Sequence, residues 1–168
     1  MQLDGEHLVD VLRDKINTLS PGTAIVGIHS GGVWVAQRLH KKLGGKNLLG
    51  SLAVTLHRDD FGSIGLHPQK NSTEMPFSVD GRHVLLVDDV IHTGRTLRAA
   101  LNELFDFGRP ASVKLACLVD RGGRELPFNA DFVGMTMTLD ADQELTLVQA
   151  NDKLRFDIQP KTPAPTQT

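Results

Sequence analysis

Hydrophobic residues recur along the chain at helical spacing in three stretches, and each stretch ends at a cluster that contains glycine or proline. In the first, Leu8, Leu12 and Ile16 would share one face of a helix. The spacing predicts helices over residues 5–18, 33–43 and 96–107.

Short unbroken apolar runs lie between and after these helices. Such runs are typical of strands that are buried on both faces of a sheet. They predict strands over residues 23–28, 48–56, 84–87, 113–119, 131–133 and 144–148. Because helices alternate with strands over most of the chain, we expect an α/β domain with a parallel sheet flanked by helices.

Length and composition fit one soluble domain. The chain has 168 residues, 40% of them hydrophobic, and a formal net charge of −2. We expect a single domain over residues 1–158 and a disordered tail over 159–168. One cysteine, Cys117, excludes an internal disulfide and a zinc site built from cysteines. The near-zero net charge argues against an overall nucleic-acid-binding surface.

The sequence also predicts a cytoplasmic protein. The most strongly hydrophobic run, Val84 to Val87, is far shorter than the roughly 20 residues that a membrane-spanning helix requires. The first ten residues are acidic and lack the order of a signal peptide, a basic stretch followed by an apolar one. We therefore expect no contact with a membrane.

The clearest candidate chemistry follows the strand at 84–87. Asp88 and Asp89 come directly after it, and ligands of open α/β sheets bind beyond the carboxyl ends of the strands. A turn at Gly94 then leads into a helix, and such a turn forms an anion cradle of backbone N–H groups. Carboxylates repel phosphate, so their partners would be sugar hydroxyls or a divalent cation. Together these groups favour a sugar phosphate.

This segment, residues 84–96, resembles the phosphoribosyl-diphosphate-binding motif of the type I phosphoribosyltransferases. The resemblance implies their fold, a parallel sheet with a small C-terminal hood, here at about residues 135–158. It also implies that Asp88 and Asp89 contact the ribose hydroxyls as catalytic residues. The predicted substrate-binding residues of this segment are Val90, Ile91, His92, Thr93, Gly94, Arg95 and Thr96, of which His92 to Thr96 would hold the ribose phosphate.

Two other segments fit the same family. The segment His29-Ser30-Gly31-Gly32 stands where the family holds the diphosphate, and its glycines allow backbone N–H groups to approach oxygen anions. Arg58 stands in the long polar segment that matches the family's lid, and we expect it to act as a catalytic cation. A receiver domain also collects carboxylates at strand ends, but its acidic pair would follow the first strand, where this chain has His29-Ser30.

More narrowly, the chain resembles the bifunctional pyrimidine-operon regulator and uracil phosphoribosyltransferase family. The segments that carry this likeness are 57–61, 65–69, 105–113, 118–121 and 124–127. The resemblance implies conversion of uracil and phosphoribosyl diphosphate to UMP and diphosphate. It implies a homo-oligomer and Mg²⁺ held mainly through the substrate, with Asp88 and Asp89 as candidate direct ligands.

The family places the nucleobase beyond the last central strand. We expect Val119, Asp120, Arg121 and Asn129 to contact it. Asn129 stands where related regulators carry a basic residue, and its amide offers both a donor and an acceptor to uracil. Met135 stands where purine-using relatives place a stacking aromatic side chain. A purine phosphoribosyltransferase therefore remains a less favoured alternative.

A third alternative is a UMP-sensing, RNA-binding attenuator with weak or no catalysis. RNA binding needs basic contacts to phosphate, yet Gly31 and Gly123 stand where regulatory relatives tend to have arginine and histidine. Arg121 and Arg124 remain candidates for RNA or substrate contacts. The acidic pair and Arg58 favour the enzyme.

Overall fold

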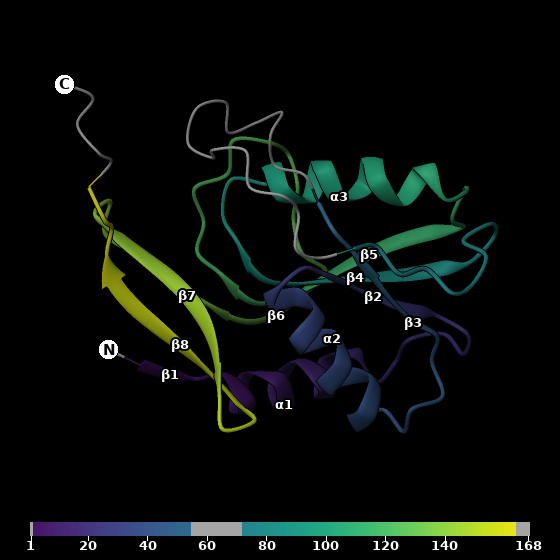
Figure 1. Cartoon of the computed structure of the whole chain (residues 1–168), viewed down its shortest axis with the longest axis horizontal. Helices are drawn as coiled ribbons and strands as arrows, with labels where there is room; N and C mark the ends of the chain where they lie inside the picture. The colour runs from purple at the N-terminus through teal and green to yellow at the C-terminus, as the bar shows by residue number, and fades with distance from the viewer. Residues whose placement is uncertain (1, 55–71, 164–168) are drawn as a thin grey trace.

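The computed structural model describes residues 2–54 and 72–163, which form three helices and eight strands in two sheets (Figure 1). The elements in chain order are β1 Gln2–Asp4, α1 Gly5–Ile16, β2 Ala24–Ile28, α2 Gly31–Lys42, β3 Leu49–Leu52, β4 His83–Ile91, α3 Arg95–Asp106, β5 Ser112–Asp120, β6 Phe132–Thr136, β7 Gln143–Ala150 and β8 Lys153–Pro160.

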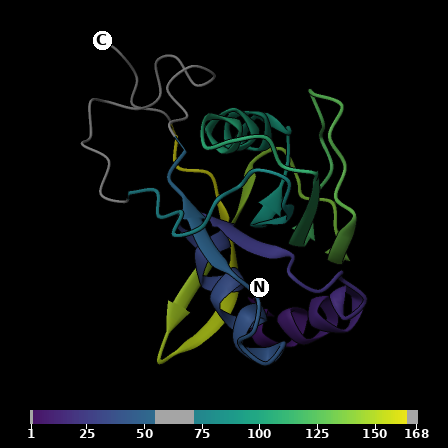
Figure 2. The ribbon, with the colours of Figure 1, turned by 90° about the vertical axis from the view of Figure 1, so that its right-hand side faces the viewer.

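The larger sheet has the strand order β3-β2-β4-β5-β6, and all its pairs are parallel. Helices α1 and α2 cover one face and α3 covers the other, as both ribbon views show (Figures 1 and 2). Alternate residues of β4 separate these two cores: Leu85 packs with α1 and α2, while Val84 and Leu86 pack with α3. This confirms the predicted α/β class with a parallel sheet.

The smaller sheet joins the two ends of the chain. Its order is β1-β8-β7, and both pairs are antiparallel, with Gln2 opposite Asp157. Leu147 and Phe156 of this sheet are buried in the core formed with α1 and α2. Part of the second sheet is therefore continuous with the core of the domain, and it contains the N-terminal strand as well as the C-terminal hairpin.

Element boundaries differ from the sequence predictions in several places. The strand expected over 84–87 extends to Ile91, because Asp88, Val90 and Ile91 continue to pair with β5. Strands β1 and β8 were not predicted, and β8 runs two residues into the stretch expected as a tail, to Pro160. Of the strand expected over 48–56, β3 covers Leu49–Leu52; residues 55 and 56 lie outside the described residues.

Two narrower expectations can also be compared with the structure. Cys117 is completely buried among apolar side chains, as its position in an apolar run predicts. No helix within residues 2–54 and 72–163 has the length and apolar character that crossing a membrane requires.

The burial of Phe156 in the smaller sheet predicts that two Phe→Ala substitutions will differ in their effect on stability. Phe156 is fully buried, whereas Phe105 on α3 is 54% exposed. Phe156→Ala should lower the free energy of unfolding by about 3–5 kcal/mol, because it leaves a cavity in the core. The matched control Phe105→Ala should lower it by less than about 1 kcal/mol. Urea unfolding measures both, and equal losses would contradict the placement of β8 in the core.

Candidate active site

The acidic pair lies within β4. Asp88 is 6% exposed, and its carboxylate accepts a hydrogen bond of 2.9 Å from the backbone N–H of Asp89. Asp89 in turn accepts one of 2.9 Å from the N–H of Val90. Burial, followed by the nearby charge of Asp89, raises the pKa of Asp88 well above its ordinary value. The described residues thus compensate the charge of ionised Asp88 poorly, as is common at ligand-binding sites.

The glycines of the predicted diphosphate loop lie directly against this pair. A Cβ on Gly31 would meet the carboxylate of Asp89, 2.7 Å from its Cγ, and one on Gly32 would lie 3.1 Å from the Cα of Asp88. Both glycines begin α2, where helix geometry leaves backbone N–H groups without an intrahelical acceptor. The peptide bond between His29 and Ser30 is cis. The structure therefore brings the 29–32 loop and the acidic pair together.

The predicted phosphate-binding stretch, residues 92–96, begins with the loop 92–94 that connects β4 to α3, here called the phosphate loop. Gly94 caps α3 with a φ of +93°, a conformation that glycine adopts without strain. The N–H of Arg95 donates to the Thr93 hydroxyl at 3.2 Å. Arg95 and Thr96 form the first turn of α3, so their N–H groups belong to a helix N-terminus, which favours anions.

The segment predicted to contact the base follows β5 and lies beside the phosphate loop. Val119 pairs with Val90 and Asp120 with Ile91 in the parallel register. The N–H of Arg121 donates to the carbonyl of Ile91 at 3.1 Å. Among the described residues, Arg121 Nε is buried without a hydrogen-bond partner.

Asp120 and Arg124 form a bidentate ion pair at the end of β5. The two nitrogen–oxygen distances are 2.9 and 2.7 Å, and the side chains are 21% and 20% exposed. Burial raises the pKa of Asp120, but the hydrogen bonds from Arg124 and from the N–H of Gly122 outweigh it, so the pKa is lowered. The sequence offered Arg124 as an RNA or substrate contact, whereas here its guanidinium is occupied within the protein.

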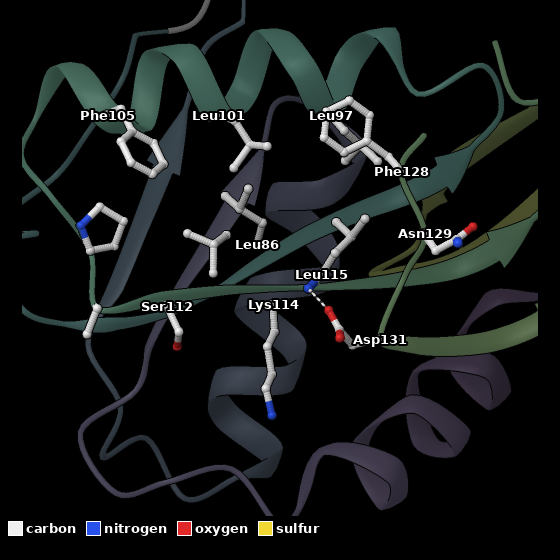
Figure 3. Close-up of a pocket in the computed structure, with 13 residues that line it drawn as sticks. Leu86, Leu97, Leu101, Phe105, Ser112, Lys114, Leu115, Phe128, Asn129 and Asp131 are labelled. Atoms are coloured by element: carbon white, nitrogen blue, oxygen red, sulfur yellow. Dashed lines mark hydrogen bonds between the residues drawn. The ribbon is translucent and has the colours of Figure 1, made fainter. Parts of the chain in front are cut away.

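Asn129 directly follows Phe128, whose carbonyl accepts a hydrogen bond of 2.6 Å from Arg124 Nε. The exposed side chain of Asn129 is one of thirteen that line a cavity of about 380 Å³ between α3 and β5, which contains none of residues 88–94 (Figure 3). Apolar side chains such as Leu101 and Phe105 dominate that cavity, and the amide of Asn129 points away from them. Contact between Asn129 and the base therefore stays a prediction. Arg58 and the predicted lid up to residue 71 lie outside the described residues, whereas residues 72–82 of the same polar segment are described, and Glu74 forms a β-bridge with Ser51.

The described acidic residues suit a cation that is held mostly by oxygen atoms of a bound substrate. Residues 2–54 and 72–163 contain no group of three or more His, Cys, Asp or Glu side chains placed to hold a metal ion. Asp88 and Asp89 are two adjacent carboxylates, and Mg²⁺ commonly binds one or two carboxylates together with substrate phosphates. These residues fit magnesium that arrives with a phosphorylated substrate.

The contacts between the phosphate loop and residues 125–128 were not predicted from the sequence. A Cβ on Gly94 would lie 3.3 Å from the ring of Phe128 and 3.4 Å from the Cβ of Leu126. The carbonyl of Thr93 accepts hydrogen bonds from the N–H groups of Glu125 and Leu126. Nothing in the local sequence indicates these contacts, because they join positions about thirty residues apart.

Comparisons with known proteins agree with this geometry. A family model described as the phosphoribosyl transferase domain matches residues 5–150. The chain is similar to Bifunctional protein PyrR of Pseudomonas paraeruginosa, with 57% identity over 73% of this chain and 72% of that protein. It is similar to Bifunctional protein PyrR of Ralstonia nicotianae, with 48% identity over 96% of this chain and 97% of that protein.

Solved structures share the fold at much lower sequence identity. A hypoxanthine-guanine phosphoribosyltransferase from Bacillus anthracis has a TM-score of 0.64 and 18% identity, over 80% of this chain and 81% of that one. Hypoxanthine phosphoribosyltransferase from Trypanosoma cruzi has a TM-score of 0.60 and 23% identity, over 83% and 78% of the two chains. These likenesses establish the fold alone.

The opposite pKa shifts of Asp88 and Asp120 predict opposite effects on stability. Asp88 favours its neutral form in the folded protein, so Asp88→Asn should raise the free energy of unfolding at pH 7. Asp120 favours its charged form, so Asp120→Asn should lower that free energy, by roughly 1 kcal/mol for a partly buried ion pair. Urea unfolding of the ligand-free protein at pH 7 measures both changes.

The difference in free energy of unfolding between each of these two variants and the wild type should shrink at low pH. Below the ordinary aspartate pKa of about 3.9, Asp88 is neutral in the folded and the unfolded wild type, so the amide no longer has an advantage. The contribution of Asp120 persists until its lowered folded pKa is passed. An Asp88→Asn protein less stable than the wild type at pH 7 would contradict this electrostatic account.

Proposed function

Because the chain belongs to the phosphoribosyl transferase family, in the group of the PyrR proteins, we propose that it converts uracil and phosphoribosyl diphosphate to UMP and diphosphate. The observation that carries the proposal is the close approach of three segments. Gly31 and Gly32 touch the acidic pair of β4, and the phosphate loop follows that pair in the same strand and turn.

Each segment suits one part of phosphoribosyl diphosphate. The N–H groups at Gly31 and Gly32 would face the diphosphate, while the loop 92–94 and the start of α3 would hold the 5-phosphate. Asp88 and Asp89 would accept hydrogen bonds from the ribose hydroxyls. Those bonds would compensate the buried charge of Asp88, which the ligand-free protein leaves poorly solvated.

The reaction breaks the bond between the anomeric carbon and the diphosphate oxygen, and diphosphate leaves with the electron pair. A bond from N1 of uracil to the same carbon forms, and the N1 proton passes to solvent. Sugar transfer of this kind passes through a state with positive charge on the ring, as in glycoside hydrolysis. The acidic pair would stabilise that charge electrostatically, and no nucleophilic side chain is needed.

Magnesium, which this family generally uses, would supply positive charge to the diphosphate as it leaves. Asp88 and Asp89 are the described residues that would hold it, together with oxygens of the substrate. Arg58 remains a predicted catalytic cation.

Two observations favour uracil over a purine. The PyrR relatives are 48–57% identical to the chain, whereas the purine-using proteins named above share 18–23% and establish only the fold. Met135 lies in β6 directly opposite Val119, so no aromatic ring is available at that position to stack on a purine.

A second function, regulation of pyrimidine genes through UMP-dependent RNA binding, is favoured by the name of the relatives, bifunctional protein PyrR. The RNA would need basic contacts other than Arg124, whose guanidinium binds Asp120. We also propose that the protein forms a homo-oligomer and is located in the cytoplasm.

Purified protein should form nucleotide from phosphoribosyl diphosphate and Mg²⁺ when offered uracil, and not with orotate, hypoxanthine or guanine.

Asp88→Asn and Asp89→Asn should each lower kcat/KM by roughly 100-fold, the usual cost of removing a group that stabilises transition-state charge. Asp106→Asn, at the distant end of α3, is the matched control and should retain full activity. Turnover that survives the combined Asp88→Asn and Asp89→Asn change would contradict the assignment of the site.

The regulatory function predicts a gel shift with a pyrimidine-operon leader RNA that appears or strengthens when UMP is added. The shift should weaken as salt rises from about 50 to 200 mM, because phosphate contacts release counterions. No shift at low salt, with UMP present, would reject RNA regulation for that leader and leave the enzyme proposal untouched.

A further inference from the structure

Three consecutive backbone carbonyls before Gly94 are bound by one segment that follows β5. The carbonyl of Ile91 accepts from the N–H of Arg121 at 3.1 Å, and that of Thr93 accepts from the N–H groups of Glu125 and Leu126. Between them, the carbonyl of His92 accepts from Arg124 Nη1 at 3.0 Å. The segment 121–126 thus binds this stretch of backbone along its whole length.

The direction of these three carbonyls also determines the direction of the backbone N–H groups that follow them. In a planar trans peptide, the C=O of one residue and the N–H of the next point in opposite directions. Because the three carbonyls face segment 121–126, the N–H groups of His92, Thr93 and Gly94 face away from it. Successive N–H groups on one side of a turn form an anion-binding nest, here at the N-terminus of α3.

Arg124 provides the one side-chain contact among these carbonyl bonds. Four of its five N–H donors are used: Nε donates to Phe128 O at 2.6 Å, Nη1 to His92 O, and Nη1 and Nη2 to the two carboxylate oxygens of Asp120. Asp120 Oδ1 also accepts the N–H of Gly122 at 2.9 Å. The guanidinium therefore fixes the distance between the end of β5, the phosphate loop and residue 128.

We propose that Arg124 is a positioning residue for the 5-phosphate subsite: it holds the His92 carbonyl so that the N–H groups of the phosphate loop face the ligand's phosphate. The inference deepens the proposed function and rests on it. It also connects the two halves of the substrate site, because Asp120, which anchors Arg124, belongs to the segment predicted to contact the base. Arg124 itself does not need to touch either substrate.

Two ligands distinguish this role from a general structural one. UMP carries the 5-phosphate, whereas inorganic diphosphate with Mg²⁺ should occupy the 29–32 loop. Arg124→Lys keeps the charge but loses the fork that reaches Asp120 and His92 together, and Arg124→Met loses both. Calorimetry should show UMP affinity reduced about tenfold or more in both variants, and diphosphate affinity changed by less than about threefold.

Kinetics should divide in the same way: KM for phosphoribosyl diphosphate should rise about tenfold, with a smaller change in kcat. Arg13→Lys is the matched control, because it makes the same substitution in the exposed ion pair with Asp14 on α1, outside the proposed substrate site. Its UMP affinity should stay within about threefold of the wild type.

Equal UMP affinity in the wild type and Arg124→Lys would overturn the inference, and so would an equal loss of UMP and diphosphate affinity in a variant that keeps its cooperative unfolding transition. If Arg124→Met fails to fold, Arg124→Lys still decides the matter. Failure of the wild type to bind UMP or phosphoribosyl diphosphate would reject the proposed function instead.

Discussion

The parallel register of β4 with its two neighbours is the constraint on which the site depends. Pairing of β2 with β4, which sets Gly27 opposite Val87, delivers Gly31 and Gly32 to the acidic pair. Pairing of β4 with β5 sets Ile91 opposite Asp120 and delivers Arg124 to the phosphate loop. A parallel sheet brings the carboxyl ends of neighbouring strands to one edge, so distant segments meet there.

At that edge of the sheet, the folded protein holds one carboxylate whose negative charge is unfavourable. Asp88 is buried beside a second carboxylate and has backbone N–H as its hydrogen-bond partner, so its charge is unfavourable in the absence of a ligand. Ligand hydroxyls and a cation would remove that cost on binding. Asp120 shows the opposite arrangement, since its charge is already satisfied by Arg124. The protein thus keeps one carboxylate available for ligand and commits the other to structure.

Most of the larger sheet could be predicted from the sequence, because its buried strands are unbroken apolar runs and its helices show clear apolar stripes. The extension of β4 through Asp88 and Asp89 was missed because two carboxylates interrupt the apolar run where the strand enters the site. A boundary drawn from hydrophobicity stops too early wherever function places polar residues in a strand.

The smaller sheet and the role of Arg124 were missed for a different reason. β1 pairs with β8 across almost the whole chain, and three residues of β1 carry too little pattern to show it. Leu154, Phe156 and Ile158 do alternate with polar residues, a signal of a half-buried strand that a search for unbroken runs overlooks. The acidic pair and both glycine-containing turns were predictable because their chemistry is local, whereas Arg124 acts on His92, a residue 32 positions away.

A crystal structure of the protein with UMP tests the account most directly. The 5-phosphate should accept hydrogen bonds from the N–H groups of His92, Thr93 and Gly94, with the ribose hydroxyls on Asp88 and Asp89 and the uracil beside Val119 to Arg121. UMP bound with its phosphate away from the 92–94 loop, or with its ribose away from the acidic pair, would contradict it.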